Sequence, residues 1–289
     1  MRGYQIVKDQ CRRCLDCVQR CPVSAVELKD GVVSIRESRC VDCGICYRSC
    51  GHGAIRLDNQ VETVKKFLEA KRKVILSVDP ACGPMLPEGV TLGKLAAAAQ
   101  QLGIWDVADA SEAVAAVSAE YARLLREKHM DQILLTACPA VRNLVETNYP
   151  ELVGALAPVA SPMIAHGRML KRDFTSAAVV YVTTCGARIQ EAQDVRHSTE
   201  INAVLTLGSL LEWMRQEQID PAQCQEEPLL SEEGGAGCAG AIAGGMLLCT
   251  ARFLPDQDYE QLTADGIDRC MAVLEGMKRG TFRHCVVEL

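Results

Sequence analysis

Cysteine is the residue type in this chain whose number and spacing point most directly to chemistry. The 289 residues include 16 cysteines, and eight of these lie between residues 11 and 50 in two runs that are offset by 29 residues. Each run has the spacing Cys-x-x-Cys-x-x-Cys-x-x-x-Cys. The first run consists of Cys11, Cys14, Cys17 and Cys21, and the second of Cys40, Cys43, Cys46 and Cys50. Closely spaced thiolates of this kind are typical of metal or redox sites.

The spacing within each run suits a 4Fe-4S cubane, because three cysteines in one tight turn wrap around a single cube. In two-cluster bacterial ferredoxins the fourth ligand comes from the opposite run and is followed by a proline, as Cys21 is here by Pro22. Structural zinc sites instead use ligand pairs that are well separated in sequence. We therefore expect two 4Fe-4S clusters, one bound by Cys11, Cys14, Cys17 and Cys50 and the other by Cys40, Cys43, Cys46 and Cys21.

The duplication extends beyond the cysteines, since Ser-Ala-Val-Glu-Leu at 24–28 matches Gly-Ala-Ile-Arg-Leu at 53–57. It predicts a small α+β ferredoxin-like domain at residues 1–59 that transfers single electrons. Six arginines flank the cysteines, and they either attract a soluble, acidic redox partner such as ferredoxin or form ordinary solvated surface. They are Arg12, Arg13, Arg20, Arg36, Arg39 and Arg48.

Composition excludes several other classes of protein. The net charge of −6 and the aromatic content of 4% argue against nucleic-acid binding. Charged residues make up 24% and apolar residues 48%, as in folded globular domains. No apolar segment follows the N-terminal residues, and the longest uncharged stretch, 234–251, is rich in glycine, so we expect neither a signal peptide nor a membrane span. These features predict a cytoplasmic protein with reduced thiols.

Beyond residue 60 the pattern changes to alternating helices and strands. Short apolar runs predict strands at 74–78, 132–136, 177–183, 203–206 and 285–287. Apolar residues at helical spacing predict helices near 61–68, 93–102, 110–126, 210–214 and 267–277. Strands that alternate with helices favour an α/β large domain with a mostly parallel sheet at residues 60–289. No low-complexity linker separates it from the ferredoxin-like domain, so we expect the two to pack together.

Three of the predicted strands run into a loop that carries a cysteine, namely Cys82, Cys138 and Cys185. Ligands bind beyond the C-terminal ends of strands in parallel α/β sheets, which makes these thiols candidate metal ligands. A small buried thiol is also common at a strand end, and the spacing leaves both interpretations open. Four further cysteines are expected to be ordinary buried thiols: Cys224, Cys249, Cys270 and Cys285.

Two of these loops resemble the active-site motifs of iron-only hydrogenases. Cys138-Pro139, followed by Val-Glu-Thr-Asn-Tyr-Pro-Glu-Leu at 145–152, is similar to the first motif, Thr-Ser-Cys-Cys-Pro-x-Trp and its helix. Residues 185–191, Cys-Gly-Ala-Arg-Ile-Gln-Glu, are similar to the second motif, Met-Pro-Cys-x-x-Lys-x-x-Glu. With the ferredoxin-like domain, the resemblance covers essentially the whole chain. It also includes residues 73–107, 203–206 and 234–246.

The resemblance implies an H-cluster, which is a 4Fe-4S cubane joined through a shared cysteine to a di-iron unit carrying CO and CN⁻. Cys138 and Cys185 match two of the four cubane ligands. The other two belong to a last motif, Glu-x-Met-Ala-Cys-x-x-Gly-Cys, of which this chain has only Glu288 before it ends. Cys238 lies in the earlier glycine-rich segment and is not expected to be the bridging ligand. We expect a third centre in the large domain that is either a further 4Fe-4S cluster or H-cluster-like.

Several residues depart from the family pattern at positions that matter for proton transfer. Ala137 stands where the family has a thiol that relays protons, and Arg188 replaces a lysine that donates to a cyanide. An acidic pair in the preceding helix corresponds to Glu120-Tyr121. Alanine at the relay position also occurs in the sensory branch of the family, which turns over little hydrogen and signals to a downstream domain or protein, and the chain resembles that branch. The alternative is a hydrogenase-like iron–sulfur assembly protein or electron carrier without catalysis.

Overall fold

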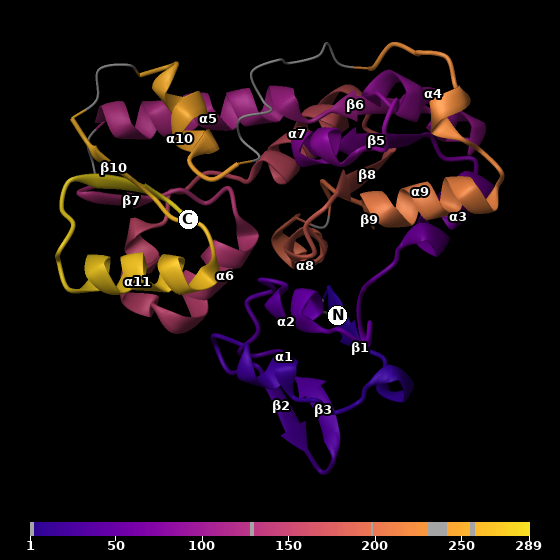
Figure 1. Ribbon diagram of the computed structural model, residues 1–289. Coiled ribbons are helices and arrows are strands. Elements are labelled where there is room, and N and C mark those ends of the chain that lie inside the picture. The colour runs from indigo at the N-terminus through magenta and orange to yellow at the C-terminus, as the bar shows by residue number, and fades with distance from the viewer. Residues whose placement is uncertain (1–2, 128–129, 198, 231–241, 255–257) are drawn as a thin grey trace.

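The computed structural model shows a small N-terminal module (residues 3–59) packed against a large domain (residues 60–289), as seen in Figure 1. It describes residues 3–127, 130–197, 199–230, 242–254 and 258–289. Within these ranges, no helix is both long enough and apolar enough to cross a membrane.

The N-terminal module consists of two antiparallel strand pairs and three short helices. Strand β1 (Tyr4–Ile6) pairs with β4 (Ile55–Leu57), and β2 (Val26–Lys29) pairs with β3 (Val32–Ile35). Asp30 and Gly31 join β2 to β3 with φ angles of 50° and 73°, and two left-handed residues are what a tight type I′ hairpin requires. The helices are η1 (Lys8–Gln10), α1 (Asp16–Gln19) and α2 (Ile45–Ser49).

The duplication in the sequence is repeated in the backbone of the module. Left-handed residues occur at positions that correspond between the two cysteine runs, and each pair helps to turn the chain around its cysteines. The pairs are Arg13 and Asp42, Leu15 and Gly44, and Ser24 and Gly53. Leu15 and Gly44 are also the N-cap residues of α1 and α2. The two halves of the module therefore share one local conformation.

The large domain contains two parallel sheets, whereas the sequence predicted a single, mostly parallel sheet. The first sheet has the order β6-β5-β8-β9, and the second has the order β10-β11-β7. The strands of the first sheet are β5 (Val74–Val78), β6 (Asp106–Asp109), β8 (Ala178–Thr183) and β9 (Ala203–Thr206). Those of the second are β7 (Gln132–Leu134), β10 (Glu260–Thr263) and β11 (Cys285–Glu288).

Helices cover both faces of the first sheet. Because successive side chains of a strand point to opposite faces, Leu76 packs into one apolar layer and Ile75 into the other. The first layer contains α3 (Val61–Glu69), α4 (Leu92–Gln101) and α9 (Leu207–Gln216). The second contains α7 (Pro162–Asp173) and α8 (Ala187–Ala192). Short 3-10 helices connect these elements: η2 (Pro80–Met85), η4 (Val195–His197) and η5 (Pro221–Gln223).

The second sheet lies between two further groups of helices. On one face Leu134 and Val287 pack with α6 (Pro139–Asn148), η3 (Pro150–Ala155) and α11 (Ile267–Lys278). On the other face Ile133 and Val286 pack with α5 (Ser111–Glu127) and α10 (Gly245–Ala251).

The N-terminal module shares one apolar cluster with the second sheet. Val23, Ala25 and Val41 of the module are buried together with Leu144 of α6 and Leu274 of α11. In Figure 1 the module lies beneath α6 and α8. A module of this size buries little apolar surface alone, and this contact adds to its core.

Candidate metal centres

Four cysteines line one hollow on the outer side of the module. They are Cys11, Cys14, Cys17 and Cys50. Arg12 and Arg13 line the same hollow and are exposed, as is Cys14. Burial raises the pKa of Cys17, and the negative charges of Cys14, Cys50 and Cys11 raise it further. The structure therefore brings together the four cysteines that spacing assigns to the first cluster.

The other four cysteines of the two runs line a second hollow, together with Tyr4. They are Cys21, Cys40, Cys43 and Cys46. The Ala25 amide donates a hydrogen bond to Cys21 Sγ at 3.1 Å. Burial raises the pKa of Cys46 to about 12, with smaller contributions from Cys40 and Cys43. These are the four cysteines that spacing assigns to the second cluster.

The chemistry of both hollows fits an iron–sulfur cluster. Burial and mutual repulsion oppose four thiolates in one place, so a highly charged cationic group between them is needed to keep the sulfurs deprotonated. Backbone amides such as that of Ala25 donate to the cysteine sulfur, as is usual around such clusters. Within the described ranges, no three or more His, Cys, Asp or Glu side chains are grouped so as to hold a single metal ion.

A cavity of about 350 Å³ lies where strands of both parallel sheets end. Its lining comes from the C-terminal ends of β8 and β11, the loops that follow β5, β7, β8 and β10, and residues of α5, α7 and α10 with the segment before α10. Side chains of the chemistry-bearing types in this lining are Asp79, Cys138, Tyr181, Cys185, Arg188, Asp265 and Glu288. This is the edge of a parallel sheet at which ligands usually bind.

Hydrogen bonds fix the loops that follow β5 and β8 to one another. Thr183 Oγ1 donates to Asp79 Oδ2 at 3.0 Å and accepts from the Cys185 amide at 3.1 Å. Asp79 Oδ1 accepts from the Ala81 amide at 3.0 Å. Because these groups lie at the ends of paired strands, they determine how Cys185 is presented to the cavity.

Of the three cysteines at strand ends, the structure brings together only two. Cys138 is the N-cap residue of α6 and lines the cavity with Cys185. Burial raises the pKa of Cys138, and the charge of Cys185 raises it further, which places the two thiols in one electrostatic environment. Cys82 instead is fully buried in the apolar layer beside α4, and its thiol donates to the Val182 carbonyl at 3.6 Å. Cys82 thus has the environment of an ordinary buried thiol.

A buried carboxylate joins the helices that follow the two cavity cysteines. Glu191, with 1% of its side chain exposed, accepts from Arg188 Nη1 at 2.8 Å within α8. Its other oxygen lies 3.9 Å from Arg142 Nη1 on α6. Burial alone lowers the pKa of Arg188, but the charges of Glu191, Tyr181 and Asp79 outweigh it and raise that pKa. Arg188 therefore brings a permanent positive charge to the cavity beside Cys185.

The residues that depart from the hydrogenase pattern have distinct environments. Ala137 lines the cavity and offers no ionisable group. Glu120 lies on the exposed face of α5, where Arg123 Nη2 donates to it at 2.7 Å. Tyr121 is buried, and its hydroxyl accepts from the Thr136 amide at 3.0 Å. Glu288 lines the cavity and accepts from the Met246 and Leu247 amides at 3.2 and 2.8 Å, and burial raises its pKa.

Some cavity residues carried no signal in the sequence. Asp79 and Tyr181 reach the cavity only through strand pairing. Glu191 belongs to the second motif, but the sequence does not predict that it bridges two arginines beside the cavity. Cys270 was expected to be an ordinary thiol, and it is buried on α11 with its thiol 3.8 Å from the Ala264 carbonyl. Burial raises its pKa to about 11, and the charge of Cys138 contributes. Cys238 lies outside the described residues.

Cysteine-lined hollows beside a parallel α/β domain define an iron–sulfur protein of the electron-transfer class. The chain matches the model of the iron-only hydrogenase large subunit, C-terminal domain, over residues 72–289, and a 4Fe-4S dicluster domain over residues 10–55. It therefore belongs to the iron-only hydrogenase large-subunit family and carries an N-terminal dicluster domain.

Solved structures of FeFe-hydrogenases resemble most of this chain in fold. An apo FeFe-hydrogenase of Chlamydomonas reinhardtii has a TM-score of 0.61 at 15% identity, covering 80% of this chain and 81% of that one. A FeFe-hydrogenase structure that describes stepwise H-cluster assembly has a TM-score of 0.65 at 16% identity over 80% of this chain and 81% of that one. At this identity the likeness shows the fold.

The curated relatives match the dicluster region. Ferredoxin-1 of Caulobacter vibrioides is 38% identical over 66 residues, which is 22% of this chain and 58% of that protein. An uncharacterized ferredoxin of Methanocaldococcus jannaschii is 42% identical over 52 residues, 17% of this chain and 31% of that protein. The formate dehydrogenase-O iron-sulfur subunit of Escherichia coli is 30% identical over 90 residues, 30% of each protein. The chain thus spans between 30% and 58% of the length of these relatives.

We predict that Glu191→Gln destabilises the protein strongly, because it removes the buried carboxylate charge shared by Arg188 and Arg142 and leaves Arg142 with the more exposed Glu146. Breaking a buried ion pair in this way costs about 3–5 kcal/mol, which urea unfolding followed by circular dichroism measures. The matched control is Glu212→Gln, whose partner Arg215 is exposed on α9; there the change is expected to be about 1 kcal/mol or less. Equal effects of the two substitutions would contradict the importance of the buried bridge.

Proposed function

We propose that residues 1–59 and 60–289 act as two domains, the first passing electrons through two 4Fe-4S clusters to a metal centre in the cavity of the second. The observation that carries this proposal is the sequence of three cysteine-lined spaces, two in the module and one in the large domain. Cys11, Cys14, Cys17 and Cys50 would hold one cluster, and Cys21, Cys40, Cys43 and Cys46 the other. When bound, each cluster accepts and releases one electron at a time.

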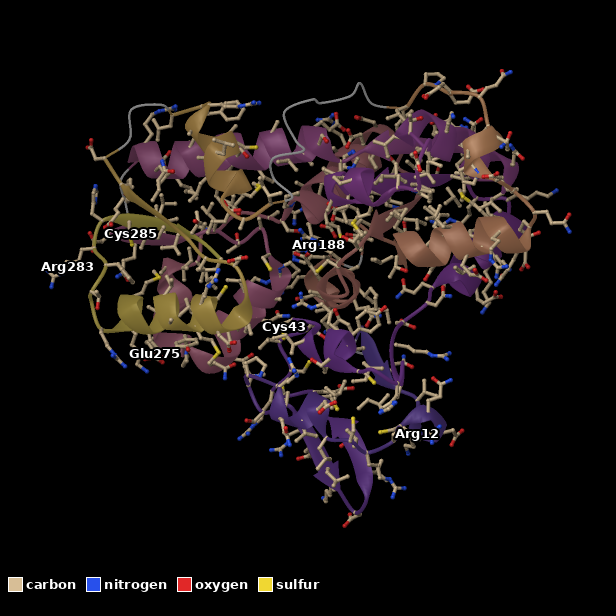
Figure 2. The ribbon with its side chains drawn as sticks, viewed as in Figure 1. Arg12, Cys43, Arg188, Glu275, Arg283 and Cys285 are labelled. Carbon is tan, nitrogen blue, oxygen red and sulfur yellow. The ribbon has the colours of Figure 1, made fainter. Side chains whose placement is uncertain are left out.

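Electrons enter, in this proposal, at the hollow lined by Cys11 and Cys14. Arg12 and Arg13 line that hollow and are exposed, and Figure 2 shows Arg12 on the outer flank of the module, away from the large domain. Their positive charge favours an acidic redox partner such as a ferredoxin. Cys43, at the edge of the module that faces the large domain in Figure 2, belongs to the second cluster.

The cavity of the large domain holds the third centre in this proposal. Cys138 and Cys185 are the ligands that the described residues offer there, with Arg188 beside them as a fixed positive charge. Thiolates bind either a 4Fe-4S cluster or the cubane of an H-cluster-like centre. The arginine balances part of the negative charge that such a centre carries, although it lacks the compact ammonium of the lysine in the family motif.

Little hydrogen turnover is expected, and we assign the chain a sensory role in which its redox state is passed to a downstream domain or protein. Proton transfer requires a continuous series of groups that exchange protons. Ala137 has no proton to exchange, and Glu120 is bound to Arg123 at the surface instead of facing the cavity. The carboxylate of Glu288 is occupied by two backbone amides.

Iron analysis tests the proposed clusters. Protein reconstituted anaerobically is expected to contain ~8 Fe per chain from the two module clusters, or ~12 with a third cubane in the cavity. Cys14→Ser is expected to remove one cluster signal from the reduced EPR spectrum. The control is Cys224→Ser, because Cys224 lies on the large domain and lines neither hollow. Two intact signals in Cys14→Ser would contradict the ligand assignment.

The same preparation tests the third centre. Cys138→Ala is expected to remove the iron above ~8 Fe per chain without changing the two module signals. Iron that stays at ~8 in both proteins would favour the alternative, an electron carrier or assembly protein whose large domain binds no metal.

The proposed entry site predicts an effect of charge on electron delivery. Arg12→Glu with Arg13→Glu is expected to slow the bimolecular reduction by an acidic ferredoxin about tenfold at low ionic strength, with a smaller difference at high salt. Stopped-flow absorbance of the clusters measures the rate. Arg172→Glu is the control, since Arg172 is equally exposed but lies on α7 of the large domain. A rate that is insensitive to Arg12 and Arg13 would place the donor elsewhere.

If the missing relay thiol at Ala137 limits hydrogen turnover, restoring a thiol there should raise the rate. In protein with a complete centre, Ala137→Cys is expected to raise hydrogen evolution from reduced methyl viologen about 100-fold, the contribution of one well-placed acid or base. Ala81→Cys, which introduces a thiol on another wall of the same cavity, is the control and is expected to have no such effect. Rapid hydrogen evolution by the unaltered chain would contradict the sensory assignment.

A further inference from the structure

One aromatic side chain lies at the joint between the N-terminal module and the large domain. Tyr4, in β1, is 8% exposed and lines the hollow formed by Cys21, Cys40, Cys43 and Cys46. The hydroxyl end of its ring reaches two glycines. A Cβ atom added to Gly186 would lie 2.5 Å from the Tyr4 hydroxyl oxygen, and one added to Gly44 would collide with the same atom. Tyr4 therefore contacts both sides of the joint at once.

The two glycines are required for different reasons. Gly44 has a φ of 75°, a conformation that already favours glycine. Gly186 has φ −67° and ψ −23°, which any residue adopts. Only the lack of space accounts for glycine at this position, because Tyr4 and Leu57 occupy the volume that a side chain would need. The backbone of the module also lies close to the Cys185 loop, since a Cβ added to Gly3 would lie 2.6 Å from the Gly186 carbonyl oxygen.

Each of the two glycines is bonded directly to a cysteine of a candidate metal site. Gly44 follows Cys43 of the second hollow, and Gly186 follows Cys185 of the cavity. Burial raises the pKa of Tyr4, and the charges of Cys185 and Cys46, from opposite sides of the joint, raise it further. The phenol is thus neutral and packed between the two sites.

We propose that Tyr4 is a positioning residue that holds the cluster of Cys21, Cys40, Cys43 and Cys46 against the Cys185 loop and keeps water out of the space between them. The proposal rests on the proposed function of these four cysteines as cluster ligands. It also identifies this cluster, and not that of Cys11, Cys14, Cys17 and Cys50, as the one adjacent to the large domain.

Exclusion of water has a consequence for the reduction potential. A 4Fe-4S cluster with four thiolate ligands becomes more negative on reduction, and water stabilises the more highly charged form. Opening the joint therefore makes the potential of the adjacent cluster less negative. The other cluster provides an internal reference, because Tyr4 does not line its hollow.

The experiment is an EPR-monitored redox titration of the anaerobically reconstituted full chain. Tyr4→Ala is expected to shift one midpoint potential to a less negative value and leave the other unchanged, whereas Tyr4→Phe stays close to the unaltered protein. Cys14→Ser identifies which potential belongs to which cluster. The control is Tyr47→Ala. It removes an aromatic ring whose centroid lies 5.9 Å from that of Tyr4 but which is 43% exposed, whereas the atoms nearest to a Cβ at Gly186 belong to Tyr4 and Leu57.

A second variant covers the case in which Tyr4→Ala loses iron or does not fold. Gly186→Ala introduces the Cβ that collides with Tyr4 and Leu57, and it is expected to shift the same potential in the same direction. Adding Tyr4→Leu to Gly186→Ala provides space for the new methyl group and is expected to reduce the shift.

The outcomes separate this inference from the proposed function. An unaltered chain without iron overturns the proposed function and this inference with it. If ~8 Fe per chain is present but neither potential moves in Tyr4→Ala or Gly186→Ala, the positioning role is wrong and the proposed function stands. Equal shifts of both potentials, or an equal shift in Tyr47→Ala, also overturn the role of Tyr4.

Discussion

The parallel register of β5 and β8 is the constraint on which the candidate site depends. Because Val78 pairs with Val182, the two strands end at the same level, and Asp79 and Thr183 meet in a hydrogen bond directly beyond them. Thr183 in turn accepts from the Cys185 amide. The pairing of the two strands therefore determines where the Cys185 thiol lies in the cavity. A change of register would separate the groups that line the cavity even if every helix remained in place.

The site also depends on the balance of charge between two largely buried arginines and one buried carboxylate. Two arginines lie on helices that begin next to Cys138 and Cys185, and each of them is costly to bury alone. Glu191 is placed between them and is almost completely covered. Arg188 brings positive charge to the cavity and lowers the pKa of Cys138, but burial outweighs this effect and raises that pKa overall. The same helices also contact the module, through Leu144 of α6 and through Gly186 at the start of α8.

Local spacing predicted those parts of the molecule that are determined within a few residues. The strands at 74–78 and 203–206 have the expected bounds, and the spacing of the cysteine runs groups the same residues that line each hollow. In the large domain the sequence does not predict β6 and β10, because these segments mix polar with apolar residues and become strands through pairing at a sheet edge. Contacts between distant segments, such as Tyr4 with Gly186, have no periodicity from which to predict them.

The N-terminal module keeps all the cysteines of the family pattern, whereas the cavity of the large domain lacks groups that the pattern uses for proton transfer. All eight module cysteines lie around two hollows, and the close packing of Tyr4 against Gly186 joins the second hollow to the Cys185 loop. Groups that would move protons are altered instead, with Ala137 in the cavity wall and Glu120 paired at the surface. Electron transfer between clusters depends on their distance and reduction potentials and does not use these groups, whereas proton transfer slows with each group in the series that is missing. The chain therefore keeps the residues that electron delivery needs more completely than those that proton transfer needs, which is the difference on which the proposed sensory role rests.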